Sequence, residues 1–126
     1  MKLAIVGATG LVGKEIITVI QERELAYSEL ILVASKKSIG KEILVNNKSH
    51  MVVGLENMIK KKPDLALFAA GSEISKEWAP KLADKGCKVV DNSSYWRMCS
   101  KHKLIIPEIN GHQITCDDFI IANPNC

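Results

Sequence analysis

Short apolar runs separated by helical patterns constrain the fold of this chain more than any other feature of its sequence. The runs are continuously apolar and do not alternate with polar residues. Continuous apolar runs are typical of strands that are buried on both faces. Strands of this kind, joined by helices, build a sheet through right-handed crossovers. We therefore predict an α/β fold with a mostly parallel sheet and helices on both faces, its strands at residues 2–6, 30–34, 65–69, 88–90, 104–106 and 119–122.

The first helix is predicted over residues 11–23, because apolar side chains recur there at helical spacing. Val12, Ile16, Val19 and Ile20 share one face of this helix, and we expect that face to pack against the sheet.

Two further helices and a hairpin complete the predicted elements. Residues 55–61 form a short helix, and residues 75–85 form a helix that buries Ile74, Trp78 and Leu82 and is disturbed in its first turns by Pro80. Residues 111–115 are expected to form a helical turn. A hairpin pairs residues 43–45 with 50–53 and turns near Asn46-Asn47.

Length and composition indicate one globular domain, residues 1–126, with 47% hydrophobic and 25% charged residues. The net charge of +3 is mild and argues against a nucleic-acid surface. No apolar run is long enough to span a membrane, and the start of the chain does not read as a signal peptide. The cysteines lack metal-binding spacing, so we expect no metal, reduced thiols and a cytoplasmic location; they are Cys87, Cys99, Cys116 and Cys126.

A glycine-rich turn follows the first predicted strand. Gly7, Gly10 and Gly13 stand between that strand and the first helix, where glycines permit a tight turn and the close approach of the backbone to a diphosphate. A purely structural turn is the alternative. Placed after a buried first strand, the glycines predict a Rossmann-type dinucleotide site at the amino end of the helix.

The residues after the second strand favour NADP over NAD. An NAD site usually has an acid there for the ribose hydroxyls, whereas this chain has Ser35, Lys36, Lys37 and Ser38. Cations and hydroxyls suit a 2′-phosphate, so we predict NADP as the cofactor. A solvated lysine-rich loop is the alternative.

The loops after the predicted strands at residues 65–69 and 88–90 face the same edge of the sheet. They carry residues 70–72 and 91–94, which suit either cofactor contacts or ordinary turns. Arg97 follows them and either grips a phosphate or carboxylate or lies on the surface stacked on Trp96.

Together these motifs make the chain resemble aspartate-semialdehyde dehydrogenases, over the amino-terminal third of those enzymes. The resemblance rests on ordered motifs at residues 7–13, 34–41, 68–72, 91–98, 107–110 and 121–126. It implies an enzyme that converts aspartyl-4-phosphate, with NADPH, to aspartate semialdehyde and phosphate, in the synthesis of lysine, threonine and methionine. It also implies a homo-oligomeric full-length enzyme.

The resemblance assigns roles to individual residues. Thr9, Gly10, Leu11 and Val12, with Gly7 in the same turn, would hold the cofactor diphosphate. Lys37 and Ser38 would meet the 2′-phosphate; many members have arginine in place of Lys37, so the NADP preference here is expected to be softer. Arg97 would bind the phosphate of the substrate. Cys126 matches the nucleophile that forms the acyl-enzyme thioester.

Departures from the family pattern are few. Cys99 stands where aspartate is common, and Ala69 and Ser72 replace the commoner serine and glycine. The related N-acetyl-glutamyl-phosphate reductases would be expected to show Asn-Pro-Gly-Cys at the end of this region, and Asn125 together with residues 92–94 favours the aspartate enzyme instead. A stand-alone NADP-binding module without catalysis remains a second alternative.

The sequence ends at the predicted nucleophile, so we expect the carboxy-terminal catalytic and dimerisation domain, with the family's acid–base histidine, to be absent from this chain. The chain would then bind cofactor without turnover, and Cys126 would be an ordinary thiol because the terminal carboxylate disfavours its thiolate. Apolar surface exposed near the carboxyl edge of the sheet would favour self-association.

Overall fold

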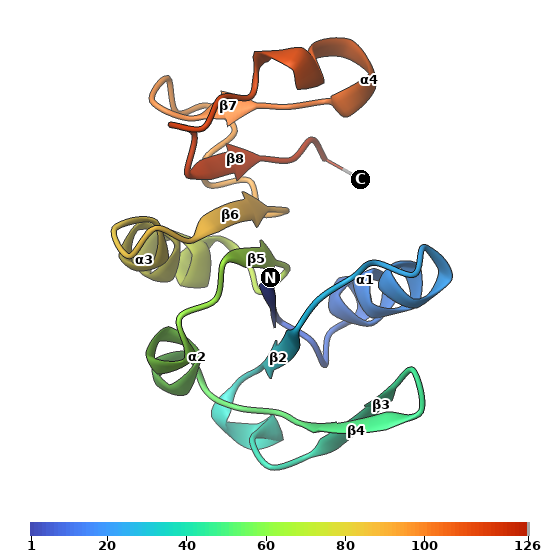
Figure 1. The fold of residues 1–126 in the computed structure, drawn as a ribbon. Coiled ribbons are helices and arrows are strands. Elements are labelled where there is room, and N and C mark those ends of the chain that lie inside the picture. The colour runs from blue at the N-terminus through green and yellow to red at the C-terminus, as the bar shows by residue number, and fades with distance from the viewer. Residues whose placement is uncertain (126) are drawn as a thin grey trace.

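The computed structural model describes residues 1–125. Its centre is a sheet of six parallel strands in the order β2-β1-β5-β6-β8-β7, beside a separate antiparallel pair, β3-β4 (Figure 1). The strands are β1 (Lys2–Val6), β2 (Glu29–Val33), β3 (Glu42–Val45), β4 (Lys48–Met51), β5 (Leu65–Phe68), β6 (Lys88–Asp91), β7 (Lys103–Leu104) and β8 (Ile120–Ala122).

Helices cover both faces of this sheet, as predicted. In Figure 1, α1 lies on one side of the sheet, while α2 and α3 lie on the other. The helices are α1 (Leu11–Glu22), α2 (Leu55–Lys61), α3 (Ser72–Ala83) and α4 (Pro107–Asn110), with short 3₁₀ turns η1 (Lys36–Ser38) and η2 (Gly111–Gln113). No helix within residues 1–125 has the length and apolar character to cross a membrane.

The core consists of two clusters, one on each face of the sheet. Alternate residues of β1 divide between them: Leu3 and Ile5 join the cluster on the α1 side, whereas Ala4 and Val6 join the cluster on the α2–α3 side. Because successive side chains of a strand point to opposite faces, this division follows from the sheet itself. The continuous apolar runs therefore predicted burial on both faces correctly.

The buried face of α1 differs from the predicted one. Gly13, Ile17 and Ile20 are buried, whereas Val12 and Val19 remain 41% and 43% exposed. The prediction that Val12 and Val19 pack against the sheet is wrong. The reason is that a glycine with no side chain occupies the closest point of contact, so apolar periodicity could not locate the buried face.

The hairpin turns at Asn46 and Asn47, as predicted, and both residues have positive φ, 50° and 62°. Its second strand begins earlier than predicted because a two-residue turn pairs Val45 directly with Lys48. Val53 has left the hairpin and forms a parallel bridge to Val33 at the outer edge of β2.

Helix α3 begins at Ser72, earlier than predicted, because Gly71 with φ of 88° turns the chain directly from β5 into the helix. The disturbance expected from Pro80 is absent from the assigned helix, which runs without interruption to Ala83.

Near the carboxyl end, β7 is shorter than predicted and α4 was not predicted. Strand β7 is only two residues long, and Pro107 begins α4 immediately after Ile106 because its ring fixes a helical φ at the first position. The predicted helical turn is present as η2.

We predict that Gly13→Ala destabilises the fold by about 3 kcal/mol, because a Cβ at this position would lie 2.0 Å from the carbonyl oxygen of Gly7. Urea unfolding followed by circular dichroism measures the loss. Gly111→Ala is the matched control, since its Cβ would meet nothing closer than 3.9 Å and should change stability by less than about 1 kcal/mol. Equal stability of the two variants would contradict the assigned contact.

Candidate functional site

Two glycines bring three segments of backbone together at the amino end of α1. A Cβ on Gly7 would lie 2.4 Å from the carbonyl oxygen of Ala69, and Gly7 has φ of 93°. Gly13 approaches the carbonyl of Gly7 from the first turn of the helix. Only glycine fits either position, and the turn therefore holds β1, the loop after β5 and α1 in close contact.

The amino end of α1 carries main-chain donors without a capping side chain. Gly10 occupies the N-cap position and provides no side-chain hydrogen bond. Within residues 1–125, the amides of Leu11, Val12 and Gly13 have no main-chain or side-chain acceptor, whereas Lys14 already donates to the carbonyl of Gly10. Free N–H groups together with the helix dipole favour an anion at this position.

A cleft opens beside these donors, at the carboxyl ends of β1, β2 and β5. It has a volume of about 330 Å³ and is lined by Gly7, Thr9, Gly10, Ser35, Ala69 and Ala70, among others. A second hollow of about 490 Å³ shares Ser35 with it and continues past Lys36 toward Trp78 of α3. Open α/β sheets bind nucleotides at such an edge, and the two hollows adjoin there.

The basic loop after β2 forms the 3₁₀ turn η1. Lys36 lines the second hollow, whereas Lys37 is exposed and lines neither hollow in the described part of the chain. Ser38 is buried, and its amide donates to the carbonyl of Ser35. Successive side chains of a 3₁₀ turn point about 120° apart, so Lys36 and Lys37 face different directions.

The loops after β5 and β6 meet at the same edge, as the sequence predicted. The hydroxyls of Ser72 and Ser94 lie 3.2 Å apart. Asp91 is buried and accepts hydrogen bonds from the amide and the hydroxyl of Ser93. Asp91 and Ser93 thus form a structural turn, one of the two interpretations that the sequence allowed.

Arg97 is fixed by main-chain carbonyls. Its Nε donates to the carbonyl of Asn123 at 2.8 Å, and one of its terminal nitrogens donates to the carbonyl of Asn92, also at 2.8 Å. The side-chain amide of Asn123 in turn donates from Nδ2 to Oδ1 of Asn92 at 2.5 Å. The sequence did not predict this clasp, because residues 92 and 123 are far apart in the chain and only the pairing of β6 with β8 brings them together.

Trp96 does not form the surface stack that was considered for Arg97. Trp96 is buried, donates from Nε1 to the hydroxyl of Ser75 at 3.0 Å, and packs edge-on against Tyr95 and His102. Burial lowers the pKa of His102. The predicted nucleophile, Cys126, lies outside the described residues; Asn123 precedes it by three positions in the sequence.

None of the described cysteines occupies the cleft. Cys87 is buried in the core, and burial raises the pKa of its thiol to about 12. Cys116 is exposed and Cys99 is half-buried. Within residues 1–125, no group of three or more His, Cys, Asp or Glu side chains is arranged to hold a metal ion.

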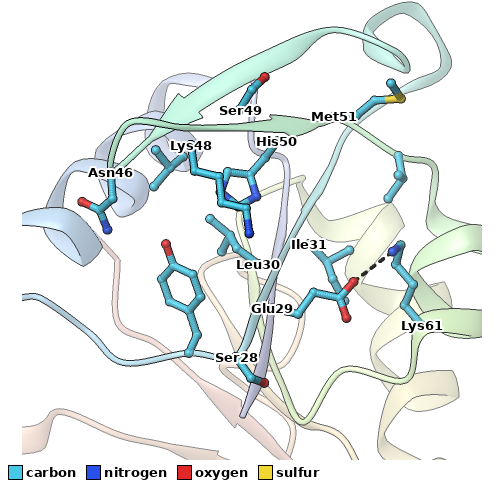
Figure 2. A pocket seen from close by; sticks show the side chains of 13 residues that line it. Ser28, Glu29, Leu30, Ile31, Asn46, Lys48, Ser49, His50, Met51 and Lys61 are labelled. Atoms are coloured by element: carbon cyan, nitrogen blue, oxygen red, sulfur yellow. Dashed lines mark hydrogen bonds and ion pairs between the residues drawn. The ribbon is translucent and has the colours of Figure 1, made fainter.

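A further cavity of about 520 Å³ lies between β2 and β4, and none of the predicted site residues lines it (Figure 2). On one wall, Nζ of Lys61 lies 2.9 Å from a carboxylate oxygen of Glu29, and this hydrogen bond lowers the pKa of Glu29. On the other wall, burial and the charge of Lys48 lower the pKa of His50. Glu29 is thus already paired with Lys61, in an exposed ion pair at the outer edge of the sheet.

The parallel sheet, the glycine turn and the cleft at the carboxyl edge define a Rossmann-type dinucleotide-binding domain. The family model described as the semialdehyde dehydrogenase NAD-binding domain matches residues 2–116. The chain therefore belongs to the semialdehyde dehydrogenase family, through this NAD-binding domain.

Curated proteins that match nearly the whole chain are named aspartate-semialdehyde dehydrogenases. The chain is 47% identical to the aspartate-semialdehyde dehydrogenase of Aquifex aeolicus, covering 99% of this chain and 38% of that protein. It is 43% identical to aspartate-semialdehyde dehydrogenase 2 of Vibrio cholerae, covering 98% of this chain and 37% of that protein. The chain thus spans about two fifths of the length of the curated relatives it matches.

Solved structures agree with the sequence relatives. The crystal structure of aspartate semialdehyde dehydrogenase II from Vibrio cholerae, complexed with ASA, matches with a TM-score of 0.93 and 42% identity, covering 99% of this chain and 42% of that one. The enzyme of Candida albicans, solved with NADP, matches with a TM-score of 0.79 at 21% identity, over 99% of this chain and 42% of that one. The second likeness supports the fold alone.

We predict that Cys116 reacts with a disulfide reagent in the folded protein at pH 8, whereas Cys87 reacts only after unfolding. With a pKa of about 12, the Cys87 thiol is ionised in only about one molecule in 10⁴ at that pH, and the core also shields it. Timed labelling followed by peptide mass mapping assigns each thiol. Labelling of Cys87 in the folded protein as fast as that of Cys116 would contradict the assignment.

Proposed function

We propose that this chain binds NADP in the cleft at the carboxyl edge of its sheet, as the cofactor-binding portion of an aspartate-semialdehyde dehydrogenase. The observation that carries the proposal is the uncapped amino end of α1, whose free amides border a cleft that continues to a basic loop. The membership of the semialdehyde dehydrogenase family supports the same proposal.

The main chain would bind the part common to both nicotinamide coenzymes. The amides of Leu11 and Val12, the backbone of Gly10 and the hydroxyl of Thr9 would hold the diphosphate, and Gly7 would keep the turn open beside it. Three free amides and a helix dipole provide the positive potential that a diphosphate requires. When bound, NADPH would supply the hydride for reduction of the substrate.

The loop after β2 would distinguish NADP from NAD. Ser35 and Lys36 line the two hollows, and Lys37 and Ser38 belong to the same 3₁₀ turn. The 2′-phosphate would lie at this turn, with the ammonium groups of the lysines as its cations. A lysine offers one point charge where an arginine offers a planar fork, so the selectivity should be moderate.

Arg97 and Cys126 would act on the acyl phosphate. Arg97 uses two of its five N–H donors on carbonyl oxygens, which leaves donors and its full positive charge for the substrate's phosphate. The thiolate of Cys126 would attack the acyl carbon of aspartyl-4-phosphate; a carbon–sulfur bond forms, the acyl–phosphate bond breaks, and phosphate leaves. Reduction of the resulting thioester would release aspartate semialdehyde and return Cys126 as its thiolate.

The whole enzyme would work in the cytoplasm as a homo-oligomer on the route to lysine, threonine and methionine. We infer these features from the family resemblance; the chain spans about two fifths of the length of the relatives that it matches.

We predict that the chain binds NADP at least tenfold more tightly than NAD, as measured by calorimetric titration at low ionic strength. The double variant Lys36→Met/Lys37→Met should lose most of this preference, a change of about 1.4 kcal/mol in NADP binding, with NAD affinity unchanged. The two single variants identify which lysine provides the cation.

The control for this titration is Lys48→Met, which removes a lysine of the hairpin that lies outside the cleft. Its NADP affinity should equal that of the unmodified chain. Tighter binding of NAD than of NADP would refute the assigned cofactor. Equal losses of NADP affinity in all the lysine variants would show that the net charge of the protein, and not the loop after β2, causes the preference.

We predict further that a polypeptide of residues 1–126, prepared on its own, oxidises no NADPH in the presence of aspartyl phosphate, and that its Cys126 alkylates near neutral pH no faster than a model thiol. In the family, the acid–base histidine and a substrate-binding arginine lie in the carboxy-terminal domain, which a polypeptide of residues 1–126 prepared on its own would lack; in such a polypeptide a carboxylate at Cys126 would also disfavour its thiolate. Turnover above background, or rapid selective alkylation of Cys126, would show that the chain is catalytically sufficient.

A further inference from the structure

The β3-β4 hairpin diverges from the outer edge of β2 and leaves a cavity of about 520 Å³ between β2 and β4. The main chains are joined where the amide of Val53 donates to the carbonyl of Leu32 at 2.8 Å. Within residues 1–125, β4 itself pairs with β3 and not with β2. We call the space that remains the β2–β4 cavity; its lining includes Tyr27, Leu30, Ile31, Val45, Lys48 and His50.

The floor of the β2–β4 cavity combines apolar side chains with main-chain groups of an edge strand. Leu30, Ile31 and Val45 contribute the apolar surface. In a paired strand, the main-chain groups of alternate residues point to the same side. The amide and carbonyl of Leu30 therefore face away from β1, as the carbonyl of Leu32 does. Main-chain groups at a sheet edge retain their capacity to bind a ligand.

Two side chains of β4 point into the β2–β4 cavity from the opposite wall. Lys48 and His50 are two residues apart in a strand, so they share one face of it. Figure 2 shows both side chains pointing from β4 toward Leu30. Within residues 1–125, the ammonium group of Lys48 forms no ion pair with a carboxylate.

The charges around the β2–β4 cavity do not balance. Of the lining side chains in the described part of the chain, Glu29 is the one carboxylate. Its oxygens lie 2.9 Å from Nζ of Lys61 and 3.8 Å from Nζ of Lys2. The positive charge of Lys48 is therefore left without a counterion at the β4 wall, beside His50.

We propose that the β2–β4 cavity binds a small organic anion, a carboxylate with an aromatic or branched aliphatic body. The carboxylate lies between Lys48 and His50, where it can also accept from the main-chain amide of Leu30, and the body lies on the apolar floor. Sites for small ligands are mostly apolar with a few polar groups that fix orientation, and their volumes begin at about 300 Å³. The site is separate from the proposed NADP cleft, with which it shares no lining residue.

Binding of an anion at this site should be coupled to a proton on His50. Burial and the charge of Lys48 lower the pKa of His50, while the carbonyl of Leu30 acts in the opposite direction. A bound anion opposes the effect of Lys48 and raises this pKa, so the complex takes up a proton. The affinity for the anion therefore rises as the pH falls through the pKa of His50.

Other charged groups near His50 do not reverse this coupling. The titratable side chains that line the cavity with it are Tyr27, Glu29, Lys48 and Lys61. Glu29 is already paired with Lys61. Glu42 of β3 stands opposite Met51, so it lies on the other face of the hairpin from His50.

NMR titration of the chain with 3-phenylpropionate near pH 7, at low ionic strength and without phosphate, tests the proposal. We expect saturable shifts of the resonances of residues 27–31 and 48–50, with a dissociation constant on the order of 1 mM. The amide 3-phenylpropanamide has the same body without the charge, and acetate has the charge without the body. Each should bind at least about tenfold more weakly.

Lysine variants test the position of the anion. Lys48→Met should weaken binding of 3-phenylpropionate at least about fivefold, whereas Lys48→Arg keeps the charge and should retain most of the affinity. Lys41→Met is the matched control, because Lys41 is also exposed beside the hairpin but does not line the cavity. Since both lysines are exposed, folding should be intact, which circular dichroism and a urea midpoint check.

The proton coupling is measured with 2-phenylethanesulfonate, which stays ionised over the range used. Its affinity should rise about threefold to tenfold between pH 8 and pH 5.5, and the Hε1 resonance of His50 should titrate at a higher pH when the ligand is bound. His50→Gln should abolish this rise and leave the affinity at pH 8 within about twofold.

Several results would overturn the proposal. These are the absence of saturable shifts up to 20 mM ligand, equal losses of affinity in Lys48→Met and Lys41→Met, and shifts confined to residues 7–12 of the cleft. An affinity for the sulfonate that does not change with pH would exclude the role of His50. Saturating NADP and the variant Lys36→Met/Lys37→Met should leave binding of 3-phenylpropionate unchanged, so this site and the cofactor site are tested separately.

Discussion

The approach of Gly13 to the carbonyl of Gly7 is the contact on which the rest of this structure depends. A Cβ at either glycine would lie within 2.4 Å of a main-chain oxygen, so the helix can begin where it does only because neither residue has a side chain. The contact sets the direction of α1 and places its free amides beside the cleft. It also sets the rotation of α1 about its axis. The position of the candidate site therefore follows from this one contact.

The cations at the carboxyl edge and at the outer edge of the sheet have different hydrogen-bond partners. Arg97 is held by carbonyl oxygens of Asn92 and Asn123, which fix its position without neutralising its charge. Lys61, by contrast, is paired with the carboxylate of Glu29. A cation that is held in place and left unneutralised retains its attraction for an anion, whereas a paired cation does not. This difference separates a candidate ligand site from a structural ion pair.

The sequence predicted the elements more reliably than their contacts. The buried strands, the crossover helices and the glycine turn follow from local patterns, and they are found close to the predicted positions. The buried face of α1 was misplaced because Gly13 contributes nothing to a hydrophobic pattern, yet it is the residue nearest the sheet. The clasp of Asn92, Arg97 and Asn123 depends on the pairing of β6 with β8, which no local pattern contains. Local propensity therefore identified the fold, and tertiary packing decided which side chains meet.

The division of labour between main chain and side chains limits what substitutions at the proposed cofactor site can change. The amides of α1 belong to every residue type except proline, so dinucleotide binding there is insensitive to most side-chain replacements. The loop after β2 offers only side-chain charge, on the exposed turn η1, for distinguishing the two coenzymes. If the proposed site is correct, substitution at Lys36 or Lys37 would change coenzyme preference while the backbone cradle stays intact.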